Sequence, residues 1–185
     1  MARANTMIDE KALFKQLRNP STKEAAFTRL VHEYQEPLYW QIRRMVLSHD
    51  DADDVLQNTF IKAWNAIDSF RQESRLQTWL FRIAINESLN HLSSKKQVLS
   101  LDQTAGSVAD LLASDSYFDG DEVQQQFQAA IGTLPDKQRL VFNLKYFDEM
   151  KYEDMSELLG TSIGALKASY HHAVKKISTF FSDND

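Results

Sequence analysis

Residues 152–177 read YEDMSELLGTSIGALKASYHHAVKKI, two short helical patterns on either side of a Gly-Thr-Ser break. In the first pattern Met155, Leu158 and Leu159 recur at helical spacing. Gly160 follows where the chain must leave the helix, often with positive φ, and Ser162 suits the N-cap of the next helix. The stretch therefore predicts a helix-turn-helix and binding to duplex DNA.

The second helix of this pair has one apolar and one basic side. Residues at three- and four-residue steps form its apolar stripe: Ile163, Leu166, Tyr170, Ala173 and Ile177. The other side carries Lys167, Ala168, His171 and Lys175. No Asp or Glu occurs between Thr161 and Ser182, so this side can approach phosphates without like-charge repulsion. An ordinary surface helix with lysines is the alternative interpretation.

The composition describes a globular chain without thiol chemistry. With 185 residues and 43% hydrophobic residues, it has enough apolar material for one or two cores. The absence of cysteine excludes disulfides, thiolate metal sites and thiol catalysis, and is compatible with a reducing compartment. The most apolar run, residues 79–81, is far shorter than the roughly 20 residues that a membrane helix needs. The N-terminus lacks the continuous apolar core of a signal peptide, so we expect a cytoplasmic protein without a membrane span.

Charge is segregated along a chain whose net charge is −5. Residues 62–96 contain six basic and three acidic side chains, whereas residues 97–122 contain six acids and no base. The second stretch is also rich in small and polar residues and holds two glycines, which predicts an acidic, flexible linker. Stretches of opposite charge are expected to meet different partners.

Helical spacing dominates the rest of the chain, and the whole sequence has only five glycines and three prolines. We therefore predict an all-α protein of two helical domains joined by the linker. Helices are expected at 27–34, from a first-turn Pro37 to Met45, and at 51–67, 75–94, 123–131 and 134–147. In the helix at 51–67, the residues expected to face inward are Ala52, Val55, Leu56, Thr59, Ala63 and Ile67.

The start of the helix at 51–67 is strongly acidic. His49 and Asp53 are four residues apart and stand among Asp50, Asp51 and Asp54, which permits a metal-binding interpretation. Acids at a helix N-terminus are explained more simply by the helix dipole. The sequence contains neither a nucleophile dyad nor a phosphate-binding glycine loop. It therefore predicts no catalysis and no cofactor.

Residues 70–92, FRQESRLQTWLFRIAINESLNHL, combine cations with aromatic rings. A helical wheel puts four polar residues on one side: Arg75, Thr78, Arg82 and Asn86. Trp79 and Phe81 lie at the margins of that side. This combination suits single-stranded nucleic acid, because cations follow phosphates while rings stack on unpaired bases. The alternative is that Trp79 belongs to the core and the arginines are simply solvated.

These motifs, in this order, resemble the extracytoplasmic-function (ECF) branch of the bacterial sigma-70 family of RNA polymerase sigma factors. The resemblance covers about residues 20–96 and 123–180. Residues 51–64 look like the family's polymerase-clamp-binding helix, residues 70–87 like its promoter-melting and minus-ten region, and residues 134–167 like its minus-thirty-five domain. The resemblance implies an N-terminal extension at 1–19, a region 2 domain at 20–96, the linker at 97–122 and a region 4 domain at 123–185.

The resemblance implies a protein that directs core RNA polymerase to specific promoters and assists strand opening without catalysis or a cofactor. Carried over by position, the polymerase contacts would be Asp53, Asp54, Gln57 and Phe60. The contacts to the melted non-template strand at minus ten would be Arg71, Arg75, Thr78, Trp79, Arg82 and Asn86. The contacts to the minus-thirty-five duplex would be Lys167, Ser169, Tyr170, His171 and Lys175, although periodicity puts the ring of Tyr170 largely in the core. Relatives are often held by an anti-sigma factor, which adds a further candidate partner.

The chain departs from the family pattern at particular positions. Leu80 stands where housekeeping sigma factors have a second adjacent tryptophan, which implies weaker intrinsic melting. Ser169 and His172 stand where relatives often carry arginine, so the upstream promoter sequence is not predicted. Two rival functions are a free-standing helix-turn-helix regulator that binds duplex DNA as a dimer, and a helical metal-dependent hydrolase built on the acids at 49–54.

Overall fold

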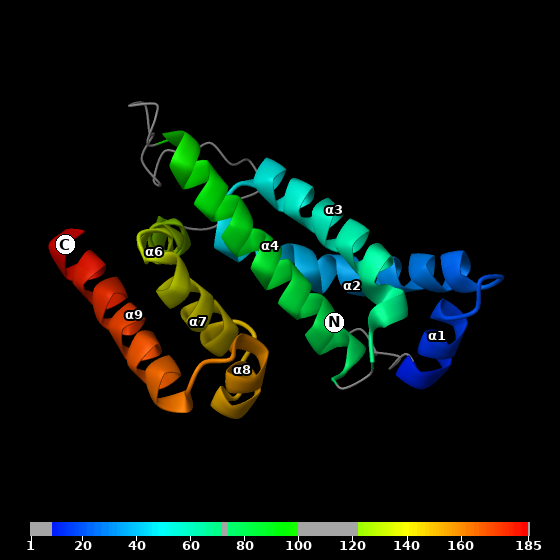
Figure 1. Ribbon diagram of the computed structural model, residues 1–185. Helices are drawn as coiled ribbons and strands as arrows, with labels where there is room; N and C mark the ends of the chain where they lie inside the picture. Colours follow the sequence, from blue (N-terminus) through cyan, green and yellow to red (C-terminus); the bar gives the residue numbers. More distant parts are fainter. Residues whose placement is uncertain (1–8, 72–73, 100–121, 185) are drawn as a thin grey trace.

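The computed structural model describes residues 9–71, 74–99 and 122–184, and in these ranges every regular element is helical (Figure 1). The elements are α1 (Glu10–Leu17), α2 (Lys23–Val46), α3 (His49–Ala66), the short 3-10 turn η1 (Ile67–Ser69), α4 (Leu76–Leu99), α6 (Glu122–Gly132), α7 (Asp136–Tyr146), α8 (Tyr152–Leu159) and α9 (Ile163–Asn184). The prediction of an all-α fold is confirmed. Residues 97–99 of the predicted linker belong to α4, and residues 100–121 lie outside the described part of the chain.

Helices α1 to α4 form the N-terminal part of the molecule. Helices α2, α3 and α4 pack on one another, and α1 packs on α2. Helix α3 buries Ala52, Val55, Thr59, Ala63 and Ile67 at its inner side or just after its end, as the spacing predicts. Leu56 was also expected inside but is only half-buried, because it lies at the margin of a surface groove.

Helix α2 corrects the prediction that Pro37 opens a new helix. The helix runs unbroken from Lys23 to Val46 with Pro37 inside it. The proline is exposed, and the helix buries Tyr34 before it and Leu38 after it on the same side. A proline within a helix removes one backbone hydrogen bond. Burial of this continuous apolar stripe offsets that loss, so the helix does not end there.

Helix α1 lies within the segment that the sequence showed only as an extension. Asp9 caps it, because its carboxylate accepts hydrogen bonds from the backbone N–H groups of Lys11 and Ala12, both at 3.1 Å. Leu13, Phe14 and Leu17 are buried at the packed side of the helix. The chain before residue 20 therefore contributes to the core of the N-terminal part.

Helices α6 to α9 form the C-terminal part, in which α6, α7 and α8 all pack on α9. The predicted helix-turn-helix is confirmed in α8 and α9. Gly160 ends α8 in the left-handed region at φ 61°, and the hydroxyl of Ser162 accepts a hydrogen bond from the N–H of Ala165 at 3.3 Å. Leu166, Ala173 and Ile177 are buried as predicted. In Figure 1, α7 and α8 lie beside α4, so the two parts are packed together.

The two parts share one apolar cluster. Helices α7 to α9 contribute buried side chains to the cluster that also holds the core of α1 to α4: Leu140, Val141, Leu144, Met155, Leu158 and Leu166. Beside this cluster the guanidinium of Arg44 pairs with Asp148 at 2.9 Å, and the amide of Asn143 donates to the carbonyl of Arg44 at 3.1 Å. Burial raises the pKa of the Asp148 carboxyl, while Arg44 acts in the opposite direction.

Candidate nucleic-acid and protein interfaces

The polar side of α4 opens onto two adjoining hollows. The first, of about 450 Å³, is lined by Ser74, Arg75, Gln77, Thr78, Phe81, Met150, Asp154, Glu157 and Leu158. The second, of about 470 Å³, is lined by Ser69, Phe70, Arg71, Ser74, Trp79, Arg82 and Glu157. The structure thus brings together the predicted minus-ten residues Arg71, Arg75, Thr78, Trp79 and Arg82. Asn86 is exposed farther along α4 and lines neither hollow.

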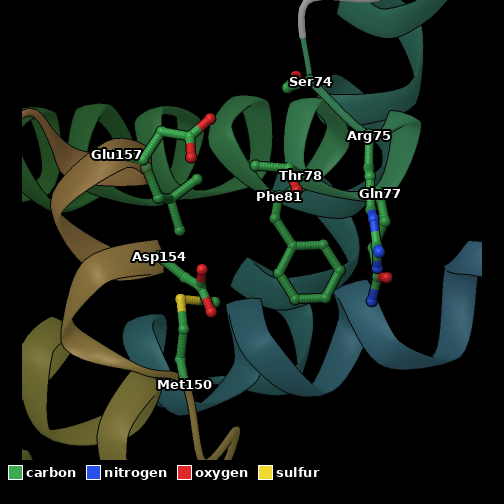
Figure 2. Close-up of a pocket in the computed structure, with 9 residues that line it drawn as sticks. Ser74, Arg75, Gln77, Thr78, Phe81, Met150, Asp154 and Glu157 are labelled. Atoms are coloured by element: carbon green, nitrogen blue, oxygen red, sulfur yellow. The ribbon is translucent and has the colours of Figure 1, made fainter.

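The first helix of the helix-turn-helix forms the opposite wall of these hollows. Figure 2 shows Thr78 and Phe81 on one side of the first hollow and Asp154 and Glu157 on the other. Across this gap, Arg82 Nη2 donates to the backbone carbonyl of Glu157 at 3.2 Å. An acidic side of α8 therefore faces the basic side of α4 and covers part of it.

Arg82 keeps further hydrogen-bonding capacity in this arrangement. Its Nε is buried and has no hydrogen-bond partner within the described residues. A guanidinium has five N–H donors in a planar fork that matches phosphate and base edges. Arg82 can therefore bind an acceptor other than the carbonyl of Glu157 when one is available.

Trp79 both packs and faces the second hollow. Its ring is half-buried and lies 4.9 Å from the ring of Phe70, with an angle of 31° between the planes. Phe70 is 7% exposed and fixes this wall of the hollow. The core interpretation of Trp79 therefore holds for part of the ring. Phe70 was not recognised from the sequence, because a turn separates it from Trp79 and helical periodicity does not extend across a turn.

A groove on α3 gathers all four predicted polymerase residues. Its hollow, of about 390 Å³, is lined by Val31, Gln35, Asp53, Asp54, Leu56, Gln57 and Phe60. Asp53, Asp54 and Gln57 are exposed at its rim, whereas Leu56 and Phe60 are half-buried. A polar rim around apolar side chains is typical of a protein–protein interface.

Sequence reasoning missed two apolar residues that extend this surface. Ile61 is 52% exposed and Trp64 is 37% exposed on α3. Trp64 lies 5.0 Å edge-on from Phe27, which in turn lies 6.5 Å edge-on from Phe60. Trp64, Phe27 and Phe60 thus form a connected row of aromatic rings beside the groove.

The acids at the start of α3 make structural contacts. The Tyr39 hydroxyl lies 2.7 Å from His49 Nδ1, and His49 Nε2 lies 3.4 Å from Asp53. Asp51 pairs with Lys95 at 2.5 Å and with His91 at 3.1 Å, which ties α3 to the end of α4. Within the described ranges, no three potential metal-ligating side chains come together.

The outer side of α9 presents the predicted basic face. Lys167, His171 and Lys175 are exposed, and Ser169 is half-buried. The ring of Tyr170 is half-buried and stacks on Phe142 with centroids 5.7 Å apart and planes 14° apart. Periodicity predicts this ring largely in the core, and the structure places it at the margin of the core, packed against it but only half-buried.

Known proteins share both parts of this architecture. Two family models match the chain, Sigma-70 region 2 over residues 30–98 and Sigma-70, region 4 over residues 124–177. The ECF RNA polymerase sigma factor SigW of Bacillus subtilis is 33% identical over 156 residues, which is 79% of this chain and 83% of that protein. The chain belongs to the ECF sigma factors.

This ECF sigma factor has further relatives and a matching solved fold. The RNA polymerase sigma-H factor of Pseudomonas aeruginosa is 31% identical over 162 residues, 82% of this chain and 84% of that protein. The sigma factor RpoE, solved in complex with the anti-sigma factor NepR from Bartonella quintana, has the same fold with a TM-score of 0.65. That likeness covers 84% of this chain and 96% of the other at 24% identity.

Membership in the family decides between the functions predicted from the sequence. As an ECF sigma factor the protein acts with core RNA polymerase at promoter DNA in transcription initiation, and the family is non-catalytic. The free-standing regulator and the metal-dependent hydrolase are therefore set aside. None of the helices in the described ranges is long and apolar enough to cross a membrane.

Proposed function

We propose that this sigma factor works through three separate surfaces. The α3 groove binds the clamp of core polymerase through Asp53, Asp54, Gln57 and Phe60. The polar side of α4 binds the opened non-template strand at minus ten through Arg71, Arg75, Thr78, Trp79, Arg82 and Asn86. The basic side of α9 binds the minus-thirty-five duplex through Lys167, Ser169, the hydroxyl of Tyr170, His171 and Lys175.

The observation that carries this proposal is the convergence of cations, hydroxyl and aromatic ring around the hollows of α4. Arg75 and Thr78 line the first hollow, and Arg71, Trp79 and Arg82 line the second. An unpaired strand offers phosphates to the arginines and the face of a base to an aromatic ring.

The proposal also covers the domain boundaries of the chain and its location in the cell. The region 2 domain spans residues 20–96 and the region 4 domain spans 123–185, with the extension at 1–19 and the acidic linker at 97–122. The protein works in the cytoplasm, where core polymerase and promoters are found. An anti-sigma factor is a further partner, supported by the matching fold of RpoE in its complex with NepR.

Binding of the minus-ten strand requires the two parts to separate. Glu157 lines both hollows, and its carbonyl holds a donor of Arg82. A DNA strand and α8 cannot occupy this space together. Core polymerase therefore supplies contacts that favour an opened arrangement, in which α8 leaves the face of α4.

Arg75 provides the test of the minus-ten assignment. Its side chain is exposed and makes no hydrogen bond or ion pair within the described residues, so Arg75→Ala leaves the packing of the two parts intact. Loss of a charge-assisted contact of about 1.5–3 kcal/mol should reduce open-complex formation on duplex promoter by about tenfold or more. On a template already mismatched across minus ten the loss should be smaller, because strand opening no longer limits activity.

Lys176→Ala is the matched control for this test. Lys176 is an exposed cation on α9 that is absent from the predicted contact residues. Its removal should leave open-complex formation unchanged on both templates. Equal losses on duplex and mismatched templates for Arg75→Ala would place the residue outside the strand-opening step and refute the assignment.

A further inference from the structure

Helix α1 contacts the segment that leads into α4. Arg18, one residue beyond α1, donates from Nη2 to the backbone carbonyl of Phe70 at 3.1 Å, across 52 positions of sequence. The ring of Phe14 meets the ring of Phe70 edge-on with centroids 5.6 Å apart. The Arg18 guanidinium also lies over the ring of Phe14, 4.8 Å from its centroid. Residues 10–18 lie before the family match at 30–98 begins.

Phe70 connects α1 to the candidate minus-ten surface. Its ring contacts the rings of both Phe14 and Trp79, with centroid distances of 5.6 Å and 4.9 Å. Phe70, Trp79 and the next residue after Phe70, Arg71, all line the second hollow. A displacement of Phe70 would therefore move two of the residues proposed to bind the melted strand.

A third hollow shows that α1 also lies beside the residues at the start of α4. It measures about 420 Å³ and is lined by Glu10, Lys11, Phe14, Phe70, Ser74, Arg75 and Leu76. One side of the hollow comes from α1 and the other from residues that lead into α4. Arg75 and Ser74 also line the first hollow, so α1 adjoins the nucleic-acid surface without being part of it.

Regular secondary structure does not hold Phe70 and Arg71 in place. Phe70 and Arg71 belong to no helix, and the carbonyl of Phe70 is bonded to the side chain of Arg18. Irregular segments keep one conformation only where such contacts satisfy their backbone groups. Side chains on such a segment are held in the geometry that binding requires by the residues packed behind them.

We propose that Arg18 and Phe14 are positioning residues for minus-ten recognition. They hold Phe70, and through Phe70 they place Arg71 and Trp79 against the melted non-template strand. This role rests on the proposed function of α4. Neither residue contacts DNA in this scheme, so their loss changes how bases are distinguished more than how the strand is attracted.

Arg29 supplies the matched control for Arg18. Its Nη1 donates to Gln16 Oε1 at 3.1 Å, which ties α1 to α2 without touching the lead-in segment. Arg18→Ala and Arg29→Ala each remove one exposed arginine that contacts α1 or its end. They differ in whether the lost contact reaches Phe70.

The experiment uses the full chain bound to core polymerase and single-stranded DNA. Wild-type holoenzyme first selects its preferred strand from a pool randomised across the minus-ten region. Affinities are then measured by fluorescence anisotropy for this strand and for its single-base substitutions.

We expect Arg18→Ala to bind the preferred strand roughly tenfold more weakly than the wild type. The variant should also distinguish less between bases at the positions read near Arg71 and Trp79. Arg18→Lys, whose ammonium can still donate to the Phe70 carbonyl, should restore part of the preference, and Arg29→Ala should keep the wild-type profile.

The possible outcomes separate the positioning role of Arg18 from the proposed role of α4. A wild-type profile in Arg18→Ala would overturn the positioning role and leave the proposed role of α4 intact. Equal losses in Arg18→Ala and Arg29→Ala would show that α1 acts only through packing, which also overturns the positioning role. Wild-type holoenzyme that selects no strand at all would overturn the proposed function of α4, and the positioning role would fall with it.

Discussion

At the scale of single residues, two glycines in the helix-turn-helix have opposite roles. Gly160 lies in the left-handed region at φ 61°, and Gly164 lies in the first turn of α9. A Cβ added at either position would meet no atom within 4 Å. The effect of an added Cβ at the two positions therefore differs only through the backbone conformation, so the stabilities of the two alanine variants can be compared directly.

We predict opposite changes in stability for alanine at these two positions. Gly160→Ala should lower the free energy of unfolding by about 1 kcal/mol, because a Cβ is strained at positive φ. Gly164→Ala should raise it by about 0.5–1 kcal/mol, because alanine favours the helix and restricts the unfolded chain. Chemical denaturation followed by circular dichroism measures both. Changes of the same sign would contradict the prediction.

At the scale of elements, the sequence predicted the helices whose apolar stripes are continuous and failed where packing overrides local preference. In α9, Leu166, Ala173 and Ile177 are buried as predicted because burial there follows the helical period, whereas Ile163 in the first turn and Tyr170 are only half-buried. Pro37 was taken as a helix start, because nothing local shows that the packing on both sides of it continues. Helix α1 was missed because only three of its residues are buried, too few to show a period in a short segment.

The α3 groove likewise shows what the sequence can and cannot predict about a candidate site. The resemblance to the family supplied its polar residues, and the structure brought them together around one hollow. Ile61 and Trp64 were not found, because an exposed apolar residue on a helix cannot be recognised from spacing alone. Their exposure becomes informative only when the partners of the helix are known.

We predict that charge reversal in this groove weakens binding to core polymerase. Asp53→Lys with Asp54→Lys replaces attraction at the rim by like-charge repulsion, which costs several kcal/mol although each original pair is worth little. The variant should keep its far-ultraviolet dichroism. Asp50→Lys is the control, since Asp50 is exposed on the same helix but lies outside the groove. Equal polymerase affinity in a direct binding assay for both variants would refute the assignment.

At the scale of the whole molecule, contacts between the two parts could not be predicted from the sequence. The acids of α8 and the arginines of α4 are far apart in the chain, and both patterns fit solvent-exposed sides. Only the structure shows that Arg82 reaches Glu157 and that Arg44 reaches Asp148. These contacts hold α8 over the surface proposed for the melted strand, so the proposed function requires them to open.

We predict that the free protein is closed and that core polymerase opens it. The chain has no cysteine, so a cysteine pair placed at Asn58 and Lys176, both exposed, can be labelled for distance measurement by energy transfer. Core polymerase should lengthen the distance, and Arg44→Glu should do so without polymerase by setting two acids against each other. The exchange Arg44→Glu with Asp148→Arg should restore the short distance. A distance unaffected by Arg44→Glu would contradict this role of the pair.

The same closure governs binding of promoter duplex by the protein alone. Wild-type protein should bind weakly at physiological salt, because α8 covers the basic side of α4, so that only the basic side of α9 is open to DNA, and because the acidic linker repels DNA. Arg44→Glu should bind more tightly than the charge-exchanged double variant. A mobility-shift assay at controlled salt, with and without core polymerase, measures this. Tight sequence-specific binding by the wild-type protein alone, on the order of 10⁻⁸ M, would contradict it.

The shared apolar cluster also has a consequence for the lifetime of the protein. Leu140, Met155 and Leu158 are buried in the cluster that joins the two parts. Separation without polymerase would turn apolar surface toward water, which favours aggregation and gives proteases access to the chain. An opened molecule is therefore durable only while polymerase covers it. Free copies of the protein, which are closed, keep this surface buried and are thereby protected until polymerase opens them and covers the surface itself.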